Sequence, residues 1–84
     1  MTKNDLINFI KKNNVEYHWL NDMSDVYICL NYYNLEEFKQ ILGENILEEG
    51  IYCIFKSGYI VFEMQNICEF FGIKIEDVFE NKEN

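Results

Sequence analysis

The sequence predicts a single α+β domain with the element order α-β-β-α-β-β-α. Apolar residues recur at helical spacing in three segments, four other runs have the residue types of strands, and short polar turns separate neighbouring strands. We expect a four-stranded antiparallel sheet with the helices packed mainly on one face. The chain of 84 residues fits one domain at 1–80, followed by a frayed charged tail at 81–84.

The first helix and the first strand pair have clear local signals. Thr2 and Asp5 have the spacing of a capping box, which predicts a helix over residues 4–14. The hydrophobic period then changes from helical to two, which predicts strands over 15–19 and 26–33. A short polar turn joins these two strands, so the pair predicts a β-hairpin.

The next segments predict another capped helix and another pair of strands. Asn34 is expected to cap a helix over 34–42, which Gly43 ends, and strands follow over 51–56 and 59–64. The two-residue connection between those strands suits a tight hairpin turn.

The last elements are a helix and a short helical turn. Asn66 is expected to cap a helix over 66–72, and the helical turn follows at 76–79.

The two halves match at an offset of thirty-two residues. Tyr27-Ile28 corresponds to Tyr59-Ile60, and Asn34 corresponds to Asn66. One interpretation is a duplicated ββα unit. The other is that any strand running into a capped helix favours these residue types at these places. Both interpretations predict the same architecture.

The charge balance excludes one class of function. The chain has 15 acidic and 7 basic residues, a net charge of −8, and no arginine. A nucleic-acid-binding surface needs clustered cations, and base readout relies on arginine. We therefore expect no direct nucleic-acid binding, and a protein partner that is basic or itself binds nucleic acid.

The cysteines and the hydropathy favour a cytoplasmic protein. Cys29, Cys53 and Cys68 are an odd number without metal or redox spacing, and we read Cys53 and Cys68 as buried core residues. Neither a signal segment nor a membrane-length apolar run is present in the sequence. We expect no metal, no cofactor and no membrane partner.

His18 is the only histidine, and it is the basis of the alternative function. Cys29 and Asp25 lie near it in the predicted hairpin, so a small hydrolase or thiol enzyme would use His18 with one of them. The alternation places His18 on the polar side of its strand, where an exposed imidazole needs no function. We therefore expect a non-enzymatic protein.

Aromatic and acidic residues are the candidate partner-binding groups. The strands carry more large aromatics than one covered face can bury, so the other face is either a protein interface or a layer of tyrosines with solvated hydroxyls. A second copy on that face would give a weak homodimer. The acids either provide solubility or imitate a nucleic-acid backbone. The candidate residues are Tyr27, Tyr33, Tyr52, Tyr59, Glu36, Glu37, Glu48, Glu49, Glu76 and Asp77.

Five segments carry a resemblance to known proteins: Asn34-Leu-Glu-Glu-Phe, Leu42-Gly43, Glu49-Gly50-Ile51, Ile67-Cys-Glu-Phe-Phe-Gly-Ile73 and Glu76-Asp-Val-Phe79. Together they resemble a group of small acidic proteins of prophages and conjugative elements in low-GC Gram-positive bacteria. The resemblance carries no catalytic motif and implies an accessory protein of a mobile element. It adds to the hypothesis of a protein-binding module that inhibits a host nucleic-acid-handling or defence complex.

Overall fold

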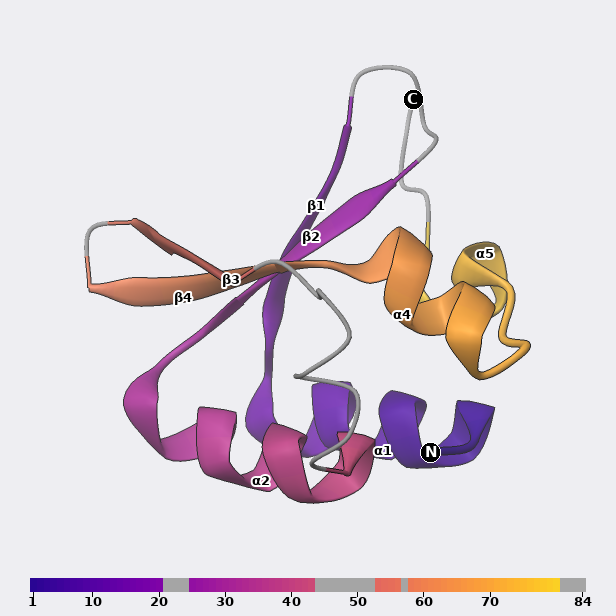
Figure 1. The fold of residues 1–84 in the computed structure, drawn as a ribbon, viewed down its shortest axis with the longest axis horizontal. Helices are drawn as coiled ribbons and strands as arrows, with labels where there is room; N and C mark the ends of the chain where they lie inside the picture. The colour runs from indigo at the N-terminus through magenta and orange to yellow at the C-terminus, as the bar shows by residue number, and fades with distance from the viewer. Residues whose placement is uncertain (21–24, 44–52, 57, 81–84) are drawn as a thin grey trace.

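The computed structural model describes residues 1–20, 25–43, 53–56 and 58–80, and for 53–56 it describes the backbone alone. Figure 1 shows a twisted sheet with helices along one side and at one end. The elements in chain order are α1 (Lys3–Asn13), β1 (Glu16–Trp19), β2 (Val26–Leu30), α2 (Tyr32–Leu42), β3 (Cys53–Lys56), β4 (Tyr59–Glu63), α4 (Met64–Phe70) and α5 (Ile75–Val78).

The strands form one antiparallel sheet in the order β1-β2-β4-β3. Two hairpins make the outer pairs, and the central pair joins β2 to β4. The predicted α+β class and the antiparallel sheet are therefore confirmed.

Alternate residues of the central strands face the helices. Along β2, Val26, Ile28 and Leu30 are buried, whereas Tyr27 and Cys29 between them are half-buried. The buried set belongs to one core cluster with residues of α1, α2, α4 and the segment after α5. The period of two is thus present in the burial of β2, as the pleat of a strand requires, although every residue of this strand is apolar or aromatic.

Three phenylalanines join the two long helices to the sheet. Phe38 of α2 stacks on Phe9 of α1 with ring centroids 5.2 Å apart, and it meets Phe62 of β4 edge-on at 5.1 Å. All three rings are almost fully buried. Such aromatic contacts add to the hydrophobic free energy of burial, so this trio anchors α1 and α2 on the sheet.

The register of the central strand pair is symmetric at the repeat offset. Ile28 pairs with Phe62 and Leu30 pairs with Ile60, and adding or subtracting thirty-two residues exchanges these two pairs. Cys29 pairs with Val61, which is its own counterpart at that offset and lies on the symmetry axis. The helices that follow also begin thirty-two residues apart, at positions 32 and 64. This symmetry favours the duplicated ββα unit.

The first predicted cap is confirmed, and the two later ones are wrong. Thr2 and Asp5 form a full capping box. In α2, however, the capping residue is Asn31: its side chain accepts from Asn34 N at 2.9 Å, and Asn34 Oδ1 accepts from Asn31 N at 2.8 Å. The predicted strand over 26–33 therefore ends at Leu30, and Asn34 lies in the first helical turn.

Asn66 lies inside α4 and does not cap it. The N-cap residue, Glu63, makes no side-chain hydrogen bond to the helix, whereas Asp25, the residue before β2, does. Its Oδ1 accepts from Gln65 N at 2.8 Å, and this bond satisfies a donor that the helix start leaves open. The predictions that concern 44–52, Ser57 and 81–84 lie outside the described residues.

Candidate functional site

The site is built on the sheet face opposite the core cluster. We call the side chains of Glu16, His18, Tyr27, Cys29, Val61 and Glu63 the outer face. Strand register arranges them in two rows across β1, β2 and β4: Glu16 beside Cys29 beside Val61, and His18 beside Tyr27 beside Glu63. The face therefore combines a thiol, an imidazole, a phenol and two carboxylates.

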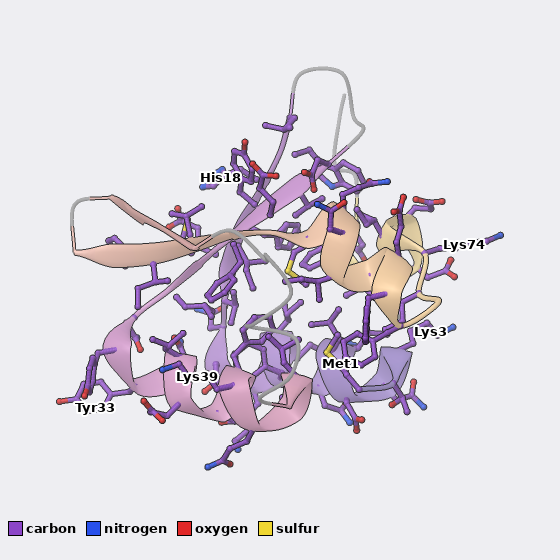
Figure 2. The ribbon with its side chains drawn as sticks, in the orientation of Figure 1. Met1, Lys3, His18, Tyr33, Lys39 and Lys74 are labelled. Atoms are coloured by element: carbon purple, nitrogen blue, oxygen red, sulfur yellow. The ribbon has the colours of Figure 1, made fainter. Side chains whose placement is uncertain are left out.

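Glu16, His18 and Cys29 form a compact donor cluster. Glu16 and His18 are two residues apart on β1, so the pleat points both to the same face, and Cys29 is the cross-strand partner of Glu16. His18 Nε2 donates to Glu16 Oε2 at 2.6 Å. One ligand atom of each residue lies within 4.8 Å of those of the other two. Figure 2 shows His18 on the side of the sheet away from α1 and α2.

Tyr27 and Glu63 make the second polar contact of the outer face. The Tyr27 hydroxyl donates to Glu63 Oε1 at 3.2 Å. The negative charge of Glu63 raises the pKa of Tyr27 above its ordinary value, and burial raises it further. Tyr27 is thus held as a neutral phenol beside a carboxylate, and part of its polar surface is already used within the chain.

Asp25 belongs to the framework of the fold and not to this cluster. It is buried, and its Oδ1 accepts from Val26 N at 2.7 Å as well as from the first turn of α4. A carboxylate that already accepts hydrogen bonds from two backbone N–H groups is a poor hydrogen-bond partner for His18. Of the two predicted partners of His18, the structure brings Cys29 close and gives Asp25 a structural role.

Three exposed tyrosines lie at the end of the sheet where β2 passes into α2, and we call Tyr32, Tyr33 and Tyr59 the tyrosine corner. Their exposed fractions are 73%, 87% and 52%. Tyr32 and Tyr33 occupy the first turn of α2, with their rings edge-to-face at 6.3 Å. Tyr59 is the first residue of β4 and precedes Ile60, which pairs with Leu30 at the end of β2. Tyr59 therefore lies at the same end of the sheet as the start of α2. Tyr33 projects from the outside of this end in Figure 2.

The candidate acids that the structure describes do not gather in one place. Glu37 pairs with Lys12 at 3.3 Å, and Glu36 lies 3.8 Å from Lys39. Glu76 and Asp77 are exposed in α5, on the opposite side of the molecule from the start of α2 (Figure 1). The predicted Tyr52, Glu48 and Glu49 lie outside the described residues.

Glu16 is a residue of the site that was not predicted from the sequence. Its signal is the spacing of two between a carboxylate and an imidazole on one strand, with a thiol on the partner strand. Cys68, by contrast, is fully buried in α4 as predicted.

Comparisons with protein-family models, with curated proteins and with solved structures find no match to this chain. In the part of the chain that the structure describes, no helix is long and apolar enough to cross a membrane. The class that fold and site define is a small α+β domain with a polar outer face and an exposed tyrosine corner.

Proposed function

We propose that this chain is a non-enzymatic protein-binding module that docks through the tyrosine corner. The observation that carries the proposal is the exposure of Tyr32 and Tyr33 at 73% and 87% on adjacent positions of one helical turn. Tyrosine is enriched at protein interfaces because its ring buries a large apolar area while its hydroxyl remains hydrogen-bonded.

The wider charge favours a basic partner. A chain of net charge −8 attracts a positively charged protein and accelerates its encounter. Glu36 lies one turn along α2 from Tyr32 and is exposed, so a carboxylate stands near the rings. Proteins that handle nucleic acids present basic surfaces. We therefore propose, as the narrower function, inhibition of a nucleic-acid-handling or defence complex by a chain encoded on a mobile element.

We propose the weak homodimer at this corner and not on the outer face, where it was expected from the sequence, because the outer face carries Glu16, His18 and Glu63. Three tyrosines of ~200 Å² each, exposed to these fractions, offer about 400 Å² per copy and roughly 800 Å² for a pair. Stable interfaces begin at about 1,200 Å², so self-association through this corner would be weak and would yield to a better partner.

Capture of binding proteins from a lysate of the source cells tests the module. The wild-type chain, Tyr33→Glu and Phe70→Glu serve as bait, and a photo-cross-linking residue at 33 or 70 identifies proteins in direct contact. Phe70 is a matched control because it is 59% exposed but lies in α4, away from the corner. We expect basic proteins that cross-link from 33, are lost with Tyr33→Glu and are weakened by salt. The same proteins captured by all three baits would contradict the proposal.

One observation favours the alternative of a thiol enzyme. The donor atoms of His18 and Cys29 lie within 4.8 Å, a separation that a small side-chain movement would close to a hydrogen bond. The bond from His18 to Glu16 would then orient the imidazole. Iodoacetamide labelling decides this alternative: an activated Cys29 reacts much more slowly after His18→Gln.

A further inference from the structure

We propose that Glu16, His18 and Cys29 form a binding site for a borderline divalent metal ion, with Zn²⁺ as the natural occupant. The three side chains supply one oxygen, one nitrogen and one sulfur, and the ligand atoms lie within 4.8 Å of one another. This inference is independent of the proposed protein-binding function, because it concerns a different part of the surface.

The donor set selects the metal. Zn²⁺ binds cysteine thiolate, histidine nitrogen and carboxylate oxygen, whereas Mg²⁺ and Ca²⁺ take oxygen ligands. Three protein ligands leave the fourth tetrahedral position to water. The site is therefore of the open kind.

The geometry needs only small adjustments. Zn–N and Zn–O distances of about 2.0–2.1 Å place two tetrahedral ligands ~3.3 Å apart, and a sulfur ligand lies ~3.5 Å from a nitrogen ligand. His18 Nε2 and Glu16 Oε2 are 2.6 Å apart in their hydrogen bond. An ion that takes the place of this hydrogen bond pushes the two atoms apart by less than an ångström. Both side chains are exposed, so they move without disturbing the core.

The backbone holds the three donors in register. Glu16 and Cys29 are direct partners in the β1–β2 ladder, and His18 follows at the next residue on the same side of β1. Two strands therefore fix the Cα positions, and only side-chain rotation remains. Binding releases the thiol proton of Cys29, and it requires the neutral tautomer of His18 that carries its ring proton on Nδ1 and leaves Nε2 to the metal.

Cobalt substitution tests the site in the intact, reduced chain after removal of metals with chelator. We expect Co²⁺ to produce the near-ultraviolet thiolate-to-cobalt band and the visible bands of four-coordinate cobalt, and Zn²⁺ to bleach both. Backbone amide NMR should place the Zn²⁺-induced shifts in β1 and β2. A chain without a thiolate band would overturn the site.

Two matched pairs of variants locate the ligands. Cys29→Ala should abolish the thiolate band, whereas Cys68→Ala should retain it, since Cys68 lies in the core. Glu16→Gln should weaken Zn²⁺ binding by at least ~10-fold, the effect typical of disturbing a metal site, whereas Glu69→Gln should leave it unchanged. Glu69 is an exposed carboxylate of α4, so this pair does not perturb folding.

The remaining outcomes also decide the proposal. A band that survives Cys29→Ala, or equal Zn²⁺ affinity in Glu16→Gln and Glu69→Gln, would refute it. Absence of cobalt binding together with slow alkylation of Cys29 in His18→Gln would refute it in favour of a thiol–imidazole pair. Loss of protein capture in Tyr33→Glu with intact Zn²⁺ binding would separate this site from the proposed function.

Discussion

Tyr27 and Glu63 face each other across the central strands of the sheet, and their side chains are joined by a hydrogen bond of 3.2 Å. They are the cross-strand pair nearest the start of α4, which begins at the residue after Glu63. The contact couples the ionisation of a tyrosine to the charge of one identified carboxylate.

We expect Glu63→Gln to lower the pKa of Tyr27 toward its ordinary value of 10.0, because the charge of Glu63 is the largest cause of the raised pKa. Tyrosinate absorbance measures this change, and the difference between each chain and its Tyr27→Phe counterpart isolates Tyr27. A raised pKa in the folded chain gives stability that is complete below about pH 10 and is lost as pH rises through the folded value. Glu69→Gln is the control, and an unchanged Tyr27 midpoint in Glu63→Gln would contradict the assignment.

The second prediction compares two asparagines that the sequence does not distinguish. Asn31→Ala removes the cap of α2 and should lower the free energy of unfolding by about 1 kcal/mol. Asn66→Ala should leave it unchanged within ~0.5 kcal/mol or raise it slightly, because Asn66 is exposed inside α4, where alanine is the better helix former. Urea unfolding monitored by circular dichroism measures both values. A larger loss for Asn66→Ala than for Asn31→Ala would show that the helix starts are misplaced.

The position of a helix start is a case where local sequence is ambiguous. Asn31 and Asn34 each have a suitable residue three positions later, so the capping rule fits both. The structure decides by pairing, because Leu30 is the last residue of β2 with a partner on β4 and the chain must turn directly after it. The start of α4 shows the same limit: Asp25, which serves it, is forty residues away in the sequence.

The site was predictable in part. The hairpin was visible in the sequence, and it placed His18 and Cys29 in neighbouring strands. The register of the hairpin could not be predicted from the sequence, and the site depends on it. A shift of one residue would move Cys29 away from Glu16 and to the other face. The repeat of thirty-two residues predicts the pairing of β2 with β4, because a symmetric central strand pair is the arrangement that a duplicated unit favours.

The third prediction concerns Cys68. Burial raises the pKa of Cys68 to about 12, and the charges of Asp25 and Glu76 add to this effect. We expect Cys68 to resist iodoacetamide at mildly alkaline pH in the native chain and to react rapidly in urea, because the thiolate is the nucleophile. Peptide mass spectrometry reports the labelled position. Equal labelling rates of Cys68 in both conditions would contradict its burial.

The same shift of the pKa has a thermodynamic consequence with a defined sign. The pKa of Cys68 is higher in the folded chain than the value of 9.0 for an ordinary thiol. Its contribution to stability is therefore complete below about pH 9 and is lost as pH rises toward about 12. Cys68→Ala should remove this part of the decline, which urea unfolding at several alkaline pH values measures.

The last prediction is that the chain forms a weak homodimer through the tyrosine corner, and that Tyr59→Glu dissociates it. Two opposing free energies decide the outcome. Burial of the three rings favours association, whereas two copies of net charge −8 repel each other. Salt at physiological ionic strength screens charges beyond about 8 Å, so the repulsion of distant acids is small and contact between the rings outweighs it. A buried glutamate at position 59 would add a desolvated charge and reverse this balance.

Sedimentation equilibrium over a range of protein concentrations measures the association. We expect the average mass of the wild-type chain to rise with concentration and the mass of Tyr59→Glu to stay that of a monomer. Phe70→Glu adds the same charge in α4, away from the corner, and should associate like the wild type. Raised salt should strengthen the wild-type dimer, because it screens the repulsion without weakening apolar burial. A monomeric wild-type chain at every concentration would refute the dimer, and dissociation by Phe70→Glu as well would place the contact elsewhere.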